Sequence, residues 1–113
     1  LAAELVKTLA SPSANGLDLF RRAHSLAERE DLVPLLELIY MHYRDALIWS
    51  LCSRPELLIF PDYPDWAQVS SGILEQCLEI INHTIRSVAF TNAHKQLSLE
   101  AAIILLRRRF AGA

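Results

Sequence analysis

The sequence predicts an all-α fold, a single compact bundle of about five helices. Apolar residues recur at intervals of three and four along most of the chain, which is the period of a helix with one buried face. No stretch keeps the strict alternation of a half-buried strand. A length of 113 residues fits one domain, and a composition of 52% apolar and 21% charged residues is typical of a globular chain, not a disordered one.

The first two predicted helices are short and amphipathic. Residues 1–10 place leucines at intervals of four on one side, and the Ser-, Pro- and Gly-containing stretch 11–16 ends that segment. We expect a second helix over residues 17–29. Its predicted buried stripe consists of Leu17, Phe20, Ala23 and either His24 or Ala27.

The third predicted helix, over residues 32–52, is apolar nearly all the way round. Asp31 is a suitable N-cap for it, and Pro34 falls in its first turn, where the missing N–H costs little. Such a helix is either the central helix of a domain or half-covered by a partner chain, and the pattern leaves both open. The three prolines of residues 53–65 predict a loop, which we expect to pack down through its apolar residues 57–60.

Two further helices complete the predicted bundle. The fourth is expected from about Trp66 to Phe90, with a broad apolar face. Its predicted polar side consists of Gln68, Gly72, Glu75, Glu79, Asn82, His83 and Arg86. The last helix is expected from about Gln96 to Phe110.

Several functional classes have no signal in the sequence. A formal charge of −2 leaves no basic footprint for nucleic acid, and no apolar run reaches the ~18–20 residues that span a bilayer. Cys52 and Cys77 lack metal-ligand spacing and are expected to be reduced, mostly buried thiols of a cytoplasmic protein. The histidines lie on separate segments, and no phosphate loop or nucleophile motif is present. We therefore predict no catalytic, metal-binding or cofactor-binding residues, and an enzyme is the least favoured class.

Two places put charge into apolar helices. Arg44 and Glu100 have mostly apolar sequence neighbours, and a buried charge persists only when it is paired or hydrogen-bonded. We expect these residues to pair with each other, with Asp45 or with exposed backbone at a helix end; the alternative is that each lies on a narrow polar strip beside Gln96 and Arg107. The cationic run Arg107–Arg109 favours either a solvated helix end or contact with an acidic patch of a partner.

Three stretches resemble a known family. They are residues 43–47 (YRDAL) in a Leu-rich helix, residues 60–62 (FPD) in the proline-rich loop, and residues 92–100 (NAHKQLSLE) before the last helix. Together, over about residues 32–110, they resemble the C-terminal collar domain of the bacterial DNA polymerase III delta-prime subunit. Phe60, His94 and Ser98 depart from the family pattern. The related collars of the gamma/tau and delta subunits remain alternatives.

The resemblance implies an oligomerisation domain spanning residues 1–113, read as a fragment that an AAA+ module would precede. It implies assembly with other clamp-loader subunits, loading of the sliding clamp during DNA replication, and contact with DNA and clamp only through the whole complex. No chemistry and no cofactor would belong to this domain. The interface or structural residues that it implies are Tyr43, Arg44, Asp45, Trp49, Asn92, Leu97, Glu100, Arg107, Arg108 and Arg109.

An assembly domain should expose an apolar patch larger than a monomer normally tolerates. The predicted members of that patch are Met41, Ile48, Trp49 and Phe110. A second hypothesis, from another class, is a helical ligand-binding regulatory domain, which needs an enclosed cavity of roughly a few hundred Å³ with convergent polar groups. The candidate lining residues for such a cavity are Tyr40, His42, Tyr43 and Trp49.

Overall fold

The computed structural model describes residues 1–11, 16–62, 64–90 and 94–111. Within them the chain forms five α-helices, one short 3-10 helix and no strand, so the predicted all-α fold is confirmed. The elements are α1 (Ala2–Ala10), α2 (Gly16–Ala27), α3 (Leu32–Cys52), η1 (Pro55–Leu57), α4 (Ser71–Phe90) and α5 (Lys95–Ala111). No helix in the described part of the chain is both long and apolar enough to cross a membrane.

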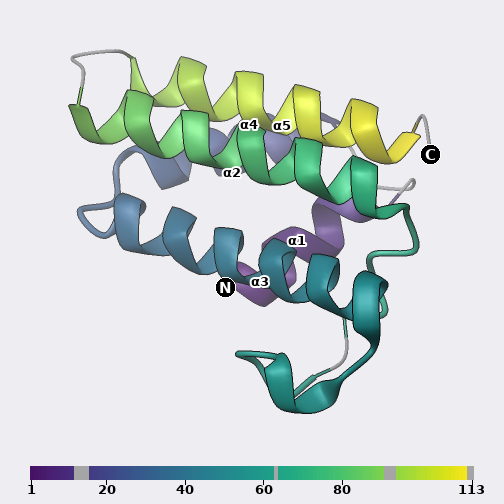
Figure 1. Ribbon diagram of the computed structural model, residues 1–113. Coiled ribbons are helices and arrows are strands. Elements are labelled where there is room, and N and C mark those ends of the chain that lie inside the picture. The colour runs from purple at the N-terminus through teal and green to yellow at the C-terminus, as the bar shows by residue number, and fades with distance from the viewer. Residues whose placement is uncertain (12–15, 63, 91–93, 112–113) are drawn as a thin grey trace.

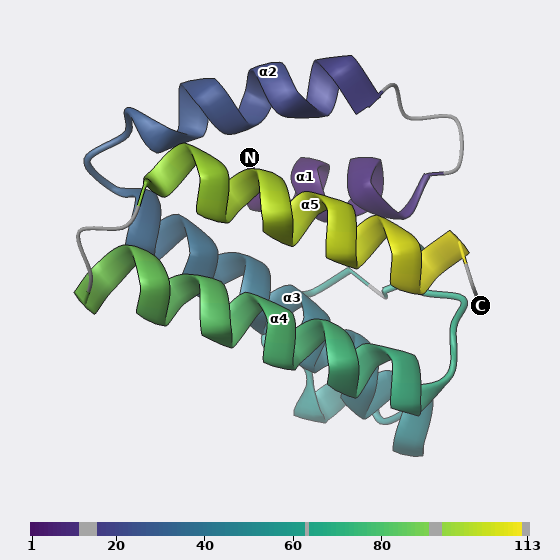
Figure 2. The same cartoon turned by 90° about the horizontal axis from the view of Figure 1, so that it is seen from above.

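The helices pack in a chain of neighbours. Helix α3 packs along α4, and α4 packs along α5 (Figure 1). Seen from above, α5 lies between α2 and α4, and α1 lies beneath it (Figure 2). Contacts of α1 with both α3 and α5 close the bundle. Helix α5 thus has neighbours on three sides and one side that faces outward.

The core is centred on Tyr43 of α3, whose side chain is fully buried. Its ring meets Trp66 and Phe110 edge to face, at centroid distances of 5.0 Å and 6.3 Å. Its hydroxyl has no hydrogen-bond partner among the described residues, and burial raises the pKa of that hydroxyl. Cys77 of α4 is buried nearby, as predicted, and burial raises the pKa of its thiol to about 11. The Tyr43 side chain is therefore held in the core by ring and apolar contacts, without a described hydrogen bond to its hydroxyl.

Helix α2 buries Ala23 as predicted, but not the rest of the predicted stripe. Leu19 and Ala23 are buried, whereas Leu17 and Phe20 are exposed. Both stripes keep the helical period, so spacing alone does not choose between them. The choice is made by packing against α5, which covers the Leu19 side.

Helix α4 begins at Ser71, five residues later than predicted. The Ser70 hydroxyl accepts a hydrogen bond from the Ile73 amide (3.3 Å), which is the N-cap interaction that starts the helix there. Trp66 lies in the preceding turn, where its ring packs on Tyr43. The residues predicted for the polar side of this helix are all exposed, and all but Gln68, which lies in the preceding loop, belong to α4.

The loop after α3 also departs from expectation. Leu58 and Phe60 are half-buried, but Leu57 and Ile59 are exposed, so only part of the stretch 57–60 packs down. Cys52, at the end of α3, is exposed and not buried.

Asp31 does occupy the N-cap position of α3, although its carboxylate binds Arg29 (2.8 and 2.9 Å) and makes no capping bond to an amide.

Candidate functional site

The Asp45 carboxylate anchors the loop that follows α3. It is buried and accepts hydrogen bonds from the amides of Ile59 (3.0 Å to each oxygen) and Phe60 (2.9 Å). Arg44 Nη1 donates to the same carboxylate (3.0 Å) and to the Leu57 carbonyl (3.1 Å). The charge is thus compensated by one cation and two amides, as burial requires. Arg44 and Asp45 serve the fold by fixing this loop.

His42 adds a further contact to the anchored loop. Its imidazole stacks on the Phe60 ring at a centroid distance of 3.9 Å, with only 9° between the planes. Burial lowers the pKa of His42, and the negative charge of Asp45 partly opposes that shift. The stack holds the loop against α3 one turn before Asp45.

Of the partners predicted for Arg44, the structure selects Asp45 and loop backbone. Glu100 has a separate role, since it accepts a hydrogen bond from Gln96 Nε2 (3.1 Å) on its own helix. Gln96 Oε1 in turn lies 3.0 Å from His24 Nδ1, and His24 Nε2 lies 3.5 Å from Glu28. This network ties α2 to α5. The sequence indicated a polar strip with Gln96 beside Glu100, but the contact with His24 was missed because His24 and Gln96 are 72 residues apart.

The outward face of α5 is apolar. Leu97, Ala101, Ile104 and Leu105, which we call the α5 ridge, are all exposed, with 61% of Leu97 and 39% each of Ile104 and Leu105 open to solvent. Their spacing of i, i+4, i+7 and i+8 aligns them along one side of the helix. The opposite side, with Leu99, Ala102 and Leu106, is buried in the bundle. Helix α5 is therefore apolar on both faces, and only one face is used by the fold.

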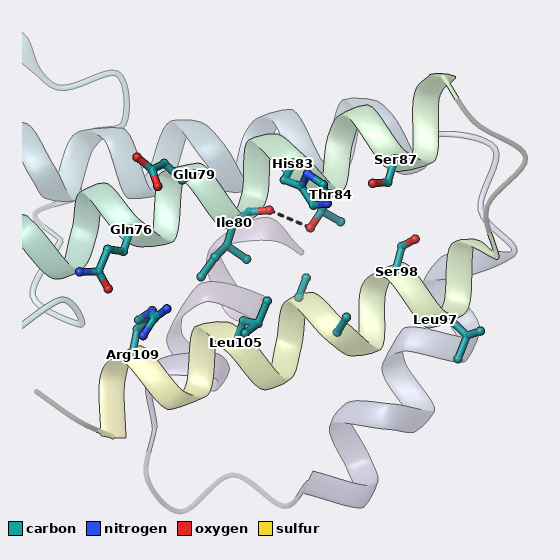
Figure 3. A pocket seen from close by; sticks show the side chains of 12 residues that line it. Gln76, Glu79, Ile80, His83, Thr84, Ser87, Leu97, Ser98, Leu105 and Arg109 are labelled. Atoms are coloured by element: carbon teal, nitrogen blue, oxygen red, sulfur yellow. Dashed lines mark hydrogen bonds between the residues drawn. The ribbon is translucent and has the colours of Figure 1, made fainter.

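Two grooves flank the α5 ridge. The α4–α5 groove has a volume of about 510 Å³, and its polar lining residues include Gln76, Glu79, His83, Ser98 and Arg109. Figure 3 shows Leu97 and Arg109 at opposite ends of this groove. The α2–α5 groove, of about 500 Å³, is mostly apolar. Its lining includes Leu9, Phe20, Ile103, Ile104, Phe110, Arg107 and Arg108.

The three arginines near the end of α5 differ in their surroundings. Arg107 is half-buried, and its guanidinium lies close to Gly16. A β-carbon at position 16 would be 3.4 Å from Arg107 Nη1. Arg108 and Arg109 are exposed, and neither forms an ion pair within the part of the chain that the structure describes. Arg108 borders the α2–α5 groove and Arg109 the α4–α5 groove. Positive charge thus stands on both sides of the α5 ridge at its C-terminal end.

The exposed apolar surface does not lie where it was predicted. Met41, Ile48, Trp49 and Phe110 are each half-buried, and Phe110 packs against Tyr43. The prediction was wrong for the three α3 residues because α3 packs against α1, α4 and the loop, and wrong for Phe110 because its ring packs against Tyr43 and Trp66. Among the other predicted interface residues, Leu97 belongs to the exposed ridge, and Asn92 lies outside the described residues.

The residues expected to line a ligand cavity do not converge. His42 lines one surface hollow and Trp49 another, while the Tyr43 hydroxyl is buried in the core. A cavity inside the bundle, between the apolar faces of the helices, has a volume of about 50 Å³, well below the ~300–1,000 Å³ of typical ligand pockets. Within the described ranges, no three His, Cys, Asp or Glu side chains are placed to hold a metal ion.

Comparisons of the chain with models of protein families, with curated proteins and with solved structures found no match. Among the residues that the structure describes, the candidate functional site is the α5 ridge with its flanking grooves.

Proposed function

We propose that this chain is a subunit-assembly domain of the clamp-loader collar type, and that it joins other subunits of a bacterial DNA polymerase III clamp loader. In that role it would support loading of the sliding clamp during DNA replication and would perform no chemistry itself. The delta-prime collar is the member that the sequence resembles, with the gamma/tau and delta collars as the alternatives. The observation that carries the proposal is the exposed α5 ridge.

The α5 ridge is hard to explain in a chain that remains alone. A helix on the surface of a bundle ordinarily presents polar residues to water, yet this ridge presents three large apolar side chains and one alanine. Covering each large side chain with a partner would contribute about 1 kcal/mol, since each is only partly exposed at present. Contiguous apolar surface bordered by charge is typical of protein–protein contact sites.

The resemblance supports the proposal from a second direction. Each of its three stretches has a part in the described fold: residues 43–45 build the core and the loop anchor, Phe60 is held by that anchor, and residues 95–100 begin α5, which carries the α5 ridge. The motif residues thus maintain a bundle whose last helix is available for docking.

The proposal is tested by mixing this chain with purified clamp-loader subunits and measuring the mass of the product by light scattering after size exclusion. We expect a complex with the unaltered chain, and at least tenfold weaker association for Ile104→Glu, because a carboxylate would be buried at the centre of the contact. Leu38→Glu is the matched control, since Leu38 is similarly exposed but lies on α3. Absence of any complex, or equal weakening by both substitutions, would contradict the proposal.

A further inference from the structure

We infer that the segment docking on the α5 ridge is an acidic amphipathic helix of a partner subunit, with its carboxylates gathered at the end that meets Arg108 and Arg109. This inference rests on the proposed assembly function and specifies the chemistry of its partner. Three features of α5 lead to it: its charge, the position of that charge, and its length.

Helix α5 is far more basic than the rest of the chain. It carries Lys95, Arg107, Arg108 and Arg109 against the single acid Glu100, a formal charge of +3 in a chain whose net charge is −2. Glu100 lies eight residues before Arg108, about 12 Å along the helix, so it does little to offset the exposed arginines. A surface that is apolar and positively bordered is complementary to one that is apolar and acidic.

The charge is placed where it would fix the partner's direction. Arg108 and Arg109 bracket the C-terminal end of the α5 ridge, one beside each groove. Glu79 extends from α4 toward the same end of the α4–α5 groove as Arg109 (Figure 3), whereas the described lining of the α2–α5 groove contains Arg108 and no acidic residue. Carboxylates of the partner are therefore accommodated best at the arginine end on the Arg108 side, where no acid repels them, and apolar residues along the rest of the ridge.

The shape of the site favours a helix as the docking segment. The 17 residues of α5 span about 25 Å of straight surface at 1.5 Å per residue. A partner helix laid along it would place residues at i, i+3, i+4 and i+7 against the ridge and the two grooves, which is the usual mode of helix recognition.

Two other occupants fit less well. Docking of two α5 ridges from two copies of the chain would bring together two helices of charge +3, and like charges oppose such a contact. Nucleic acid would use the arginines but would leave Leu97, Ile104 and Leu105 without apolar contacts, and its phosphates would meet few cations.

Site-specific cross-linking identifies the occupant. In the complex with clamp-loader subunits, Ile104 is replaced by photoreactive p-benzoylphenylalanine, the sample is irradiated, and the attached peptide is sequenced by mass spectrometry. We expect attachment to a helical segment of a partner subunit with net negative charge. Attachment to a neutral or basic segment, to a second copy of this chain or to DNA would overturn the inference.

Reversing the charge of Arg108 and Arg109 measures how much these residues contribute to association with the partner. We expect Arg108→Glu combined with Arg109→Glu to weaken association about tenfold and to flatten its dependence on salt concentration, with an unchanged circular dichroism spectrum. Arg86→Glu is the control, because Arg86 is exposed on the polar side of α4; its effect should be less than about twofold.

The outcomes separate the two proposals. If the unaltered chain assembles but charge reversal and salt have no effect, the acidic partner is refuted and the assembly function stands. If the unaltered chain does not assemble at all, the proposed function fails, and this inference fails with it.

Discussion

Replacing Asp45 with alanine should destabilise the domain by about 3–5 kcal/mol, because the substitution removes the acceptor for three donor groups. The amides of Ile59 and Phe60 would lose their partner, and the Arg44 guanidinium would keep only the Leu57 carbonyl. The chain has no other carboxylate placed among these donors in the described structure.

The magnitude follows from the contacts and their exposure. Hydrogen bonds to a charged group contribute about 1.5–3 kcal/mol each, so three donors set an upper bound of roughly 5–9 kcal/mol. Water can reach part of the site in the variant, because the Arg44 side chain is 38% exposed and Ile59 lies at the surface. The loss should therefore fall near the 3–5 kcal/mol typical of breaking a buried charge pair. Since domains have about 5–15 kcal/mol of stability, the variant should remain mostly folded.

Urea unfolding measures the change in the free energy of unfolding, and hydrogen exchange locates it. For Asp45→Ala we expect the urea concentration at the unfolding midpoint to fall, with little change in the dependence of the free energy on urea. The Ile59 and Phe60 amides should lose more protection from hydrogen exchange than amides within α4. The free energy of unfolding of Asp45→Asn should lie between those of the unaltered chain and Asp45→Ala, since the Asn side chain keeps one acceptor oxygen.

A matched control separates the anchor from a general effect on α3. Glu37→Ala removes an exposed carboxylate from the same helix and should change the free energy of unfolding by less than about 0.5 kcal/mol. A loss below about 1 kcal/mol for Asp45→Ala, or unchanged exchange at Ile59 and Phe60, would refute the anchoring role.

Three further predictions concern Tyr43 and the two thiols. Tyr43→Phe removes a buried hydroxyl without a described partner, so urea unfolding should show no loss, or a gain of up to about 1 kcal/mol; a loss above that size would reveal a missed hydrogen bond. Thiol labelling of the native chain should modify exposed Cys52 quickly and buried Cys77 only after denaturation, and Cys52→Ser should abolish the fast phase. Because the pKa of Cys77 rises from 9.0 to about 11 on folding, the unfolded state loses this proton first. The free energy of unfolding should therefore fall between pH 9 and 11, and by less in Cys77→Ala; equal slopes for the two proteins would contradict this.

The sequence by itself determined the class of fold and most of the polar surface. Helical spacing of apolar residues is a local property, so the five helices and the exposed side of α4 could be predicted without knowing their neighbours. Local chemistry also indicated that Arg44 would need a partner, since a charge among apolar residues must be compensated.

Only the tertiary structure decided which of two apolar faces is buried. Helices α2 and α5 each carry two apolar stripes of the same period, and packing against neighbouring helices selects Leu19 over Phe20 and Leu106 over Ile104. The partners of Asp45 are amides 14 and 15 residues further along, which come within reach only when the loop folds back. The α5 ridge exists for the same reason: a helix in a small bundle has neighbours on a limited number of sides, and the apolar side left over becomes the surface available to a partner.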